Sequence, residues 1–348
     1  MTPESREDVV LAAVGERRKL INEAIDEELP MAEPEMLYEA SRSLLEAGGK
    51  RLRPAMLLLV AEALADVEPL STEYRQFPAL DGRTVDVMAA AVSIEVIHSF
   101  TLIHDDIMDD DAMRRGVPAV HRAYDEETAI LAGDTLYSKA FEIMLRTDAP
   151  PERALRAMDL LATTCTHICE GQALDVAFES RTNVLPDEYI EMVELKTAVL
   201  YAAAAAVPAV IVGADDEVVD ALYQYGLCVG RAFQIQDDVL DLTVPSEQLG
   251  KQRGSDLIEG KQTIITLHAR EQGVDVDGLL PDADPETITE ADIDAAVAKL
   301  KAAGSLDYAS ETAADFIATG KEHLTVLPDN EARELLSQLA DYLIERGH

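Results

Sequence analysis

Several features that mark common protein classes are missing from this chain of 348 residues. It has no tryptophan, and its three cysteines are too few for a disulfide framework, which indicates a reducing, cytosolic setting. Residues 1–6 contain no apolar signal stretch. The longest uncharged run, 197–214, contains a proline and is short for a membrane span, so it predicts a buried helix. Few segments alternate polar and apolar residues with period two, so we expect no sheet.

Positive charge is also scarce. Against 67 aspartates and glutamates there are 29 basic residues, only 9 of them lysine, and the net charge is -38 at pH 7. Such a chain should repel nucleic acid and anionic membranes. Its hydrophobic fraction of 48% is too high for disorder. Because concentrated salt screens self-repulsion, we predict a protein adapted to concentrated salt. Its acidic, lysine-poor composition resembles that of proteins from halophilic archaea. An acidic mesophilic protein is the alternative.

Helical periodicity, in contrast, is abundant. Apolar residues recur at three-and-four spacing in most of the chain. The predicted helices are 20–28, 35–47, 52–65, 85–109, 125–145, 151–178, 188–207, 217–241, 264–272, 293–302, 305–318 and 330–346. Residues 68–84 read as an inserted surface loop. We therefore predict an all-α fold, a helical bundle around a central cavity.

Two aspartate clusters carry most of the chemical information. The first holds Asp105 and Asp109, and the second holds Asp237 and Asp241. Residues four apart on a helix share a face, so each cluster should form a carboxylate pair. Two facing pairs would repel each other unless cations lay between them. Hard oxygen ligands favour Mg²⁺, which is often shared with substrate phosphates, so the pattern predicts a diphosphate held by Mg²⁺ between two acidic helices.

Other interpretations of these clusters fit less well. A solvated acidic face does not explain the second cluster, because Phe233, Ile235 and Val239 make that segment half-buried. A di-iron bundle needs two Glu-x-x-His motifs, and the only partner of 95–98 is 345–348, at the end of the sequence. Nucleotide-binding glycine loops and the Gly-x-Ser-x-Gly hydrolase motif are absent from the sequence.

Cys165 and Cys169, with His167 between them, could suggest a second kind of metal site. No nearby residue completes a tetrahedron, so we interpret both thiols as core residues.

Basic side chains cluster close to the acidic ones. The planar guanidinium of arginine can donate two parallel hydrogen bonds to phosphate oxygens, and lysine acts as a point charge. These groups therefore predict anion binding. They could also hold a second anion without metal, which the acidic clusters alone could not. The groups are Lys50, Arg51 and Arg53 after a glycine pair, Arg114 and Arg115 after the first acidic cluster, Lys196 beside Thr197 in a helix, and Lys251 and Lys261 after the second cluster.

In this order the motifs resemble those of the trans-isoprenyl diphosphate synthases, most of all the archaeal short-chain geranylgeranyl type. The resemblance runs from about residue 40 to 266. It rests on Gly49-Lys50-Arg51-Leu52-Arg53-Pro54, Asp105-Asp106-x-x-Asp109 with Arg114-Arg115-Gly116, Gly171-Gln172-x-x-Asp175, Lys196-Thr197, Phe233-Gln234-Ile235-x-Asp237-Asp238-x-x-Asp241 and Gly250-Lys251-x-x-Gly254-x-Asp256-x-x-x-x-Lys261. It implies an isoprenoid synthase-type bundle in a single polyprenyl synthetase domain over 1–348.

The resemblance also implies residue roles. Asp105, Asp109 and Asp237 would bind Mg²⁺, three ions being usual in the family, and Asp241 with Asp175 would support the metal site. The allylic diphosphate would be held by Arg114, Lys196, Thr197, Gln234, Lys251 and Lys261. Isopentenyl diphosphate, without metal, would be held by Lys50, Arg53, His98 and Arg115.

The implied reaction condenses isopentenyl diphosphate with dimethylallyl, geranyl or farnesyl diphosphate. In the family, bulk at the fifth and fourth positions before the first motif closes the product pocket, and here these are Phe100 and Thr101. On an ideal wheel Thr101 lies about one turn below Asp105, whereas Phe100 points elsewhere. One aromatic followed by a small residue resembles the C20 pattern, so we expect geranylgeranyl diphosphate for membrane lipids. The resemblance also implies a homodimer, and we expect it to be cytoplasmic.

Several alternatives stay open. The product could be C15 or C25 instead. A class I terpene cyclase needs no isopentenyl diphosphate site, so Lys50, Arg53 and Arg115 argue against it. A non-catalytic partner subunit typically loses one aspartate motif, and this chain keeps both.

Overall fold

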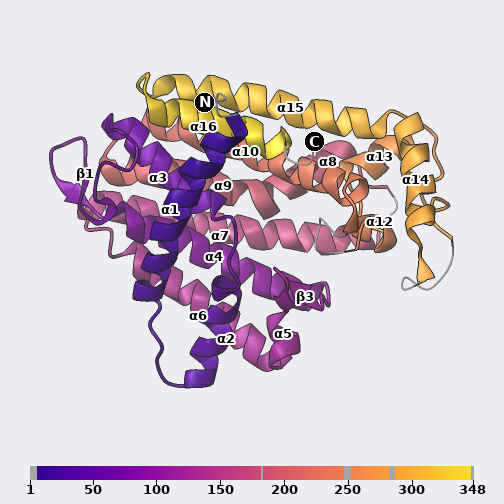
Figure 1. The fold of residues 1–348 in the computed structure, drawn as a ribbon, viewed down its shortest axis with the longest axis horizontal. Coiled ribbons are helices and arrows are strands. Elements are labelled where there is room, and N and C mark those ends of the chain that lie inside the picture. Colours follow the sequence, from indigo (N-terminus) through magenta and orange to yellow (C-terminus); the bar gives the residue numbers. More distant parts are fainter. Residues whose placement is uncertain (1–5, 182, 247–251, 282–286, 346–348) are drawn as a thin grey trace. The chain divides into compact units, whose positions relative to one another are not determined.

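The computed structural model describes residues 6–181, 183–246, 252–281 and 287–345, and in this part of the chain helices dominate (Figure 1). The predicted all-α fold is confirmed. Its described strands form two small antiparallel pairs, which the sequence did not predict. These are β1 (Phe77–Pro78) with β2 (Thr84–Val85), and β3 (Met113–Arg114) with β4 (Val117–Pro118).

The chain divides into two compact units, each built from separate stretches of sequence. Unit 1 comprises Met1–Cys165, Ala202–Tyr223 and Leu324–Leu339, and unit 2 comprises Thr166–Tyr201, Gln224–His323 and Ala340–His348. The first acidic cluster therefore belongs to unit 1 and the second to unit 2. That the whole chain forms a single domain remains a prediction.

Helix α4 is the central helix of unit 1. Every residue from 87 to 97 is buried, and apart from Glu95 this part of the helix is apolar or small on all sides. It packs most extensively on α6, and also on α3 and α1. The elements first met in this unit are α1 (Arg6–Glu28), α2 (Glu35–Glu46), α3 (Leu52–Ala65), η1 (Tyr74–Gln76), α4 (Val87–Met108), α5 (Val120–Ala123), α6 (Glu126–Met144), the start of α7 (Pro151–Glu179) and η4 (Leu324–Val326).

Unit 2 contains the remaining helices and parts of four that it shares with unit 1. In this unit α13 packs on α15 and α8, and α14 packs on α15. The predicted helix 188–207 is in fact α8 (Pro186–Val193), a π-helical segment η2 (Glu194–Ala198) and α9 (Val199–Val212). The other elements are α10 (Asp216–Thr243), α12 (Ser255–Ile258), α13 (Ile264–Glu271), α14 (Glu290–Ala302), α15 (Ser305–His323) and α16 (Glu331–Glu345).

Among the described residues, two helical segments are long and apolar enough to cross a membrane by length and composition. They are Val87–Met108 and Pro186–Val212, and 78% and 83% of their most apolar windows are buried inside the protein. Both are therefore core helices, as the sequence predicted for the 197–214 run. Of the two neighbouring cysteines, Cys165 is buried as expected, whereas Cys169 is exposed, so the prediction of a core residue is wrong for Cys169.

The insertion at 68–84 has a buried anchor. Tyr74 and Phe77 are both buried, and the Tyr74 hydroxyl donates to Glu62 Oε1 at 2.5 Å. The other oxygen of Glu62 pairs at 2.5 Å with Arg17, whose side chain is fully buried. A buried charge pair needs further hydrogen bonds to be tolerated, and Tyr74 supplies one. The insertion is thus tied to α1 and α3 rather than lying wholly on the surface.

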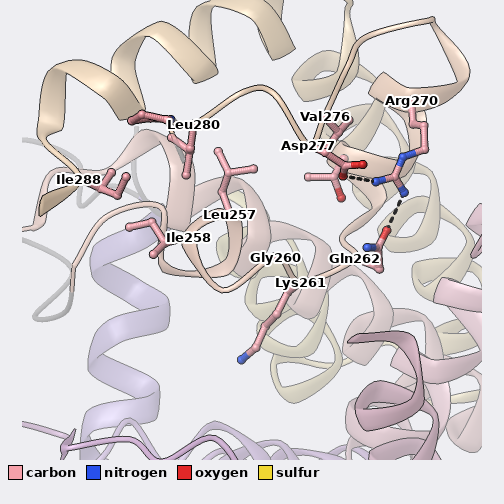
Figure 2. A pocket seen from close by; sticks show the side chains of 12 residues that line it. Leu257, Ile258, Gly260, Lys261, Gln262, Arg270, Val276, Asp277, Leu280 and Ile288 are labelled. Atoms are coloured by element: carbon pink, nitrogen blue, oxygen red, sulfur yellow. Dashed lines mark hydrogen bonds and ion pairs between the residues drawn. The ribbon is translucent and has the colours of Figure 1, made fainter. Parts of the chain in front are cut away.

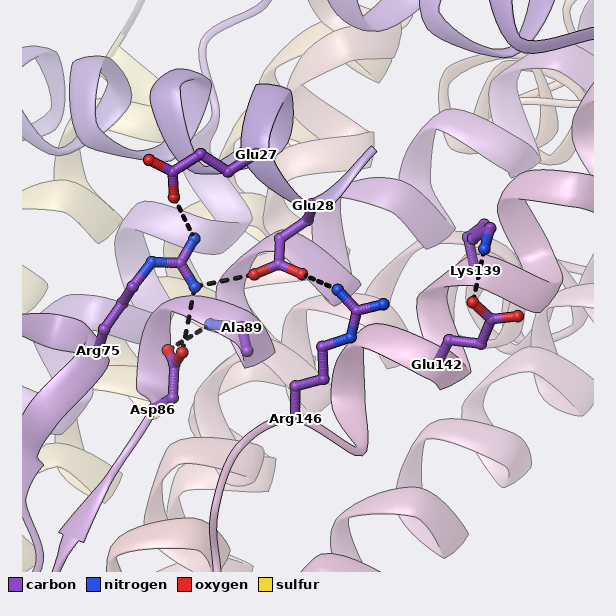
Figure 3. Close-up of polar contacts among 8 residues, drawn as sticks. All are labelled: Glu27, Glu28, Arg75, Asp86, Ala89, Lys139, Glu142 and Arg146. Carbon is purple, nitrogen blue, oxygen red and sulfur yellow. Dashed lines mark hydrogen bonds and ion pairs between the residues drawn. The ribbon is translucent and has the colours of Figure 1, made fainter. Parts of the chain in front are cut away.

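A network of ion pairs joins the insertion to α4 (Figure 3). Arg75 donates to Glu27 at 2.8 Å, to Glu28 at 2.8 Å and to Asp86 at 3.1 Å, and Arg146 donates to Glu28 at 2.6 Å. Asp86 also accepts from a backbone N–H as the N-cap of α4, and its burial raises its pKa. The insertion thereby stabilises the start of the helix that ends at the first acidic cluster.

Candidate active site

The first acidic cluster lies at the C-terminal end of α4. Asp109 is the C-cap residue, and its N–H donates to the carbonyl of Asp105 at 2.9 Å, so the two residues are one turn apart as predicted. Both are partly exposed. The C-terminal end of a helix carries partial negative charge, which disfavours carboxylates there. A bound cation would relieve this repulsion, so the placement favours a metal site.

Asp106, between them, faces the interior. It is 1% exposed and accepts from Arg114 Nε at 2.5 Å, and Arg114 also donates to Asp111 at 2.7 Å. Burial raises the pKa of Asp106 to about 6, although Arg114 opposes the shift. Arg114, which we predicted to bind diphosphate, is therefore engaged with carboxylates in this structure and ties β3 to the end of α4.

A cationic cluster is formed by side chains from the start of α3, from α4 and from the turn after β3. Arg53 Nη1 is 3.2 Å from His98 Nε2. Burial and the surrounding arginines hold the pKa of His98 well below its usual range, so its ring is neutral and can accept from Arg53. A Cβ on Gly49 would lie 2.9 Å from Arg115 Cζ, so the glycine allows that guanidinium to approach. The structure brings together Arg53, His98 and Arg115. Lys50, three residues before Arg53, is exposed.

In unit 2 the π-helical segment presents Lys196 and Thr197. Lys196 pairs with Asp175 of α7 at 2.5 Å, and Thr197 Oγ1 donates to Gln234 Oε1 of α10 at 3.0 Å. Four residues predicted to form the site are therefore joined across three elements. Single π turns inside helices occur frequently at functional sites.

Two glycines allow α7 and α10 to approach this segment. A Cβ on Gly171 would lie 2.2 Å from the backbone N of Lys196, and one on Gly230 would lie 2.5 Å from Ala198 Cα. The contacted atoms belong to the backbone and cannot rotate away. Only glycine fits at these positions, so both glycines position Lys196 and Thr197.

The second acidic cluster lies near the C-terminal end of α10. Asp237 is partly exposed, whereas Asp238 is buried and accepts from the Tyr189 hydroxyl and, at 3.1 Å, from Gln234 Nε2. Burial raises the pKa of Asp238, and the negative charge of Asp256 adds to the shift. Asp238 therefore connects Gln234 to Tyr189 of α8, a residue for which the sequence gave no signal.

Asp241 is almost fully buried and supports the chain that follows. Its carboxylate accepts from Ser255 Oγ at 2.8 Å and from the N–H of Asp256 at 3.2 Å, and its carbonyl accepts from the N–H of Gly254 at 2.8 Å. Both carboxylate oxygens thus cap the start of α12, a short helix that the sequence did not predict. The participation of Asp241 in metal binding stays a prediction.

Lys251 lies outside the described residues. Lys261 follows α12, and its Nζ is 3.1 Å from a Glu259 carboxylate oxygen. It lines a cavity of about 540 Å³ in unit 2, with apolar walls and the polar side chains of Gln262 and Arg270. Arg270 donates to Gln262 at 2.9 Å and to Asp277 at 3.0 Å, and the Lys261 amine points away from this group (Figure 2).

Phe100, predicted to close the product pocket, packs toward α6. Its ring lies 4.9 Å from His104 and 5.2 Å from Tyr137, centroid to centroid, and Tyr137 continues to Phe141 at 5.0 Å. The ring of Phe100 therefore faces Tyr137 of α6, and its position relative to the Asp105 face stays a prediction. Thr101 Oγ1 donates to the carbonyl of His98 at 2.8 Å.

The acidic clusters suit a metal shared with a ligand. Among the described residues no three carboxylate, histidine or cysteine side chains are close enough to hold a metal by themselves. Mg²⁺ usually takes one or two carboxylates and completes its shell with water and phosphate oxygens. The partly exposed carboxylates of Asp105, Asp109 and Asp237 fit that kind of ion.

Comparison with known proteins places these features in a family. The profile of the family described as polyprenyl synthetase matches residues 34–300. The chain is 67% identical over 341 residues to a geranylfarnesyl diphosphate synthase of Natronomonas pharaonis, covering 98% of this chain and 99% of that protein. It is 52% identical over 332 residues to a geranylgeranyl diphosphate synthase of Methanosarcina mazei, covering 95% and 96%.

A solved structure supports the same assignment. The geranylgeranyl pyrophosphate synthetase of Geoglobus acetivorans matches with a TM-score of 0.85 and 45% identity, over 96% of this chain and 99% of that one.

Proposed function

Because the chain belongs to the polyprenyl synthetase family and is a trans-prenyltransferase, we propose that it condenses isopentenyl diphosphate with an allylic diphosphate in a Mg²⁺-dependent reaction. One observation carries the proposal. Carboxylate pairs lie at the C-terminal ends of two helices, and a separate arginine–histidine cluster can bind an anion without metal. Two diphosphates held in different ways are what such a condensation requires.

We assign the allylic diphosphate to the acidic clusters. Asp105, Asp109 and Asp237 would hold Mg²⁺, with Asp241 and Asp175 in support. When bound, Mg²⁺ would neutralise the diphosphate and make it a better leaving group. The remaining contacts would come from Arg114, Lys196, Thr197, Gln234, Lys251 and Lys261.

Isopentenyl diphosphate would bind at Lys50, Arg53, His98 and Arg115. In the reaction the allylic C–O bond breaks, the double bond of isopentenyl diphosphate forms the new C–C bond, and a proton is lost. The released diphosphate takes that proton, so no side-chain base is required. Surrounding apolar side chains would keep water from the allylic cation.

For the product we favour geranylgeranyl diphosphate. Phe100 is a single bulky aromatic before the first motif, and its contacts with His104 and Tyr137 hold its ring in place. Geranylfarnesyl diphosphate is the second candidate, because the Natronomonas relative that is 67% identical carries that name.

Product analysis tests both the reaction and the chain length. In molar KCl with Mg²⁺, isopentenyl diphosphate and farnesyl diphosphate, we expect a C20 product by chromatography, lost on adding EDTA and reduced at low salt. Phe100→Ala should lengthen the product by at least one C5 unit. Phe141→Ala, which removes the outer ring of the same aromatic row, should not. A C25 product from the wild type would select the second candidate, and a cyclic hydrocarbon made from the allylic substrate alone would contradict the proposal.

We also propose a homodimer. Helix α6 exposes the apolar side chains of Ile130, Leu131 and Tyr137, which a second copy could cover. Leu131→Asp should convert the dimer to a monomer in light scattering after gel filtration. Leu11→Asp, at an exposed apolar position of α1, is the control and should leave the mass unchanged. A wild-type monomer would contradict this proposal.

We place the reaction in the cytoplasm, with its product used for membrane isoprenoid lipids. The two most apolar segments are core helices, and the net charge of -38 disfavours anionic membranes and nucleic acid. Recovery of the enzyme in the membrane fraction of its cells would count against this location.

A further inference from the structure

Glu95 is a buried carboxylate next to the cationic cluster. It lies on α4, nearly one turn before His98, and is 1% exposed. One of its oxygens, Oε1, accepts from Arg51 Nη1 at 2.5 Å and is 3.7 Å from Arg115 Nη2. A single carboxylate thus interacts with two arginines that belong to distant parts of the sequence.

Both arginines also bind the end of α2. Arg51 Nη2 donates to the carbonyl of Leu45 at 2.6 Å, and Arg115 Nη1 donates to the carbonyls of Leu44, at 3.2 Å, and Gly48. The last carbonyls of a helix attract cations, so these contacts are favourable. Each guanidinium is therefore held on one side by α2 and on another by Glu95.

The cluster has a net positive charge, so it can attract an anion. Arg51, Arg53 and Arg115 are permanent cations, and His98 is neutral because its pKa is lowered by burial and the arginines. The positive charge exceeds that of the one carboxylate, so the cluster remains attractive to a diphosphate.

We propose that Glu95 is a positioning residue for the diphosphate that binds without metal. It would hold Arg115 in its binding orientation and, through Arg51, the backbone that leads to Arg53. The inference rests on the proposed function, since it assumes that isopentenyl diphosphate binds to this cluster.

Positioning and simple charge neutralisation predict opposite results. If Glu95 only reduced the positive charge, its removal would strengthen diphosphate binding. If it orients the arginines, its removal should weaken binding although the positive charge increases. The sign of the change therefore identifies the role.

The test compares Glu95→Gln with Glu62→Gln. Glu62 is also 1% exposed and pairs with a buried arginine at 2.5 Å, but it belongs to the anchor of the insertion. We expect Glu95→Gln to raise KM for isopentenyl diphosphate by roughly 10- to 100-fold, as lost supports of binding groups do. KM for the allylic substrate should change by less than about 2-fold. Glu62→Gln should lower the unfolding midpoint and leave both KM values near wild type.

Binding without turnover separates this inference from the proposed function. Calorimetric titration with isopentenyl diphosphate in EDTA should show the same weakening in Glu95→Gln. Equal effects of the two variants, parallel rises of both KM values, or tighter binding would overturn the role of Glu95. A wild-type enzyme that makes no prenyl product would instead overturn the proposed function.

A third variant covers the case in which Glu95→Gln does not fold. Glu95→Asp keeps the charge but shortens the side chain, so it should fold and show a smaller rise in KM for isopentenyl diphosphate. An unchanged KM in Glu95→Asp, with Glu95→Gln unfolded, would assign Glu95 to stability alone.

Discussion

Replacing Asp105 by alanine should lower turnover by about 10³-fold, a cost expected when one strong preorganised electrostatic contact is lost. Asp105 is partly exposed at the C-terminal end of α4, where its charge has no benefit to the helix itself. The free energy of unfolding of the Asp105→Ala protein should therefore stay close to the wild-type value or increase. Steady-state kinetics and chemical denaturation of the same sample would measure both effects.

Asp110→Asn is the matched control. Asp110 is exposed, lies just beyond the motif and pairs with Arg122 on the surface, so its loss removes one negative charge nearby without removing a proposed ligand. It should retain most of the activity. Comparable losses in both variants would show that the general charge of this region, rather than a ligand at Asp105, supports the reaction.

Replacing Gly171 by alanine should damage the site through the backbone. The new Cβ would lie 2.2 Å from the N of Lys196, so η2 must move and the 2.5 Å pair between Lys196 and Asp175 must change. Overpacking of this kind costs about 1–3 kcal/mol of stability. A displacement of about 1 Å in a binding group can reduce turnover about 10²-fold. Kinetics at saturating isopentenyl diphosphate, with denaturation curves, would measure both.

Gly15→Ala is the control for this variant. Gly15 lies inside α1 and has no atoms within 4 Å of an added Cβ, so alanine should stabilise the protein by about 0.5–1 kcal/mol and leave turnover unchanged. If Gly171→Ala kept full turnover, Lys196 would not need its present position.

The aspartates show where sequence reasoning succeeded and where it stopped. The i, i+4 spacing correctly placed Asp105 and Asp109 one turn apart at a helix end. Spacing did not show that Asp106 and Asp238 turn inward, or that Asp241 caps α12, because those contacts come from residues elsewhere in the chain. In the sequence Glu95 stands out only as part of a Glu-x-x-His motif, since its partners Arg51 and Arg115 are distant in sequence.

The sequence by itself determined the helical class, most helix positions and the residue types at the site. Periodicity and motif order are local properties, so they can be read directly from the sequence. Only the tertiary structure decided which carboxylates are buried and that Arg114 pairs with Asp106. It also decided that η2 interrupts the predicted helix 188–207 and packs against Gly171 and Gly230. The physical reason is that burial and charge pairing depend on segments brought together by packing, where desolvation, rather than sequence spacing, sets the cost of each charge.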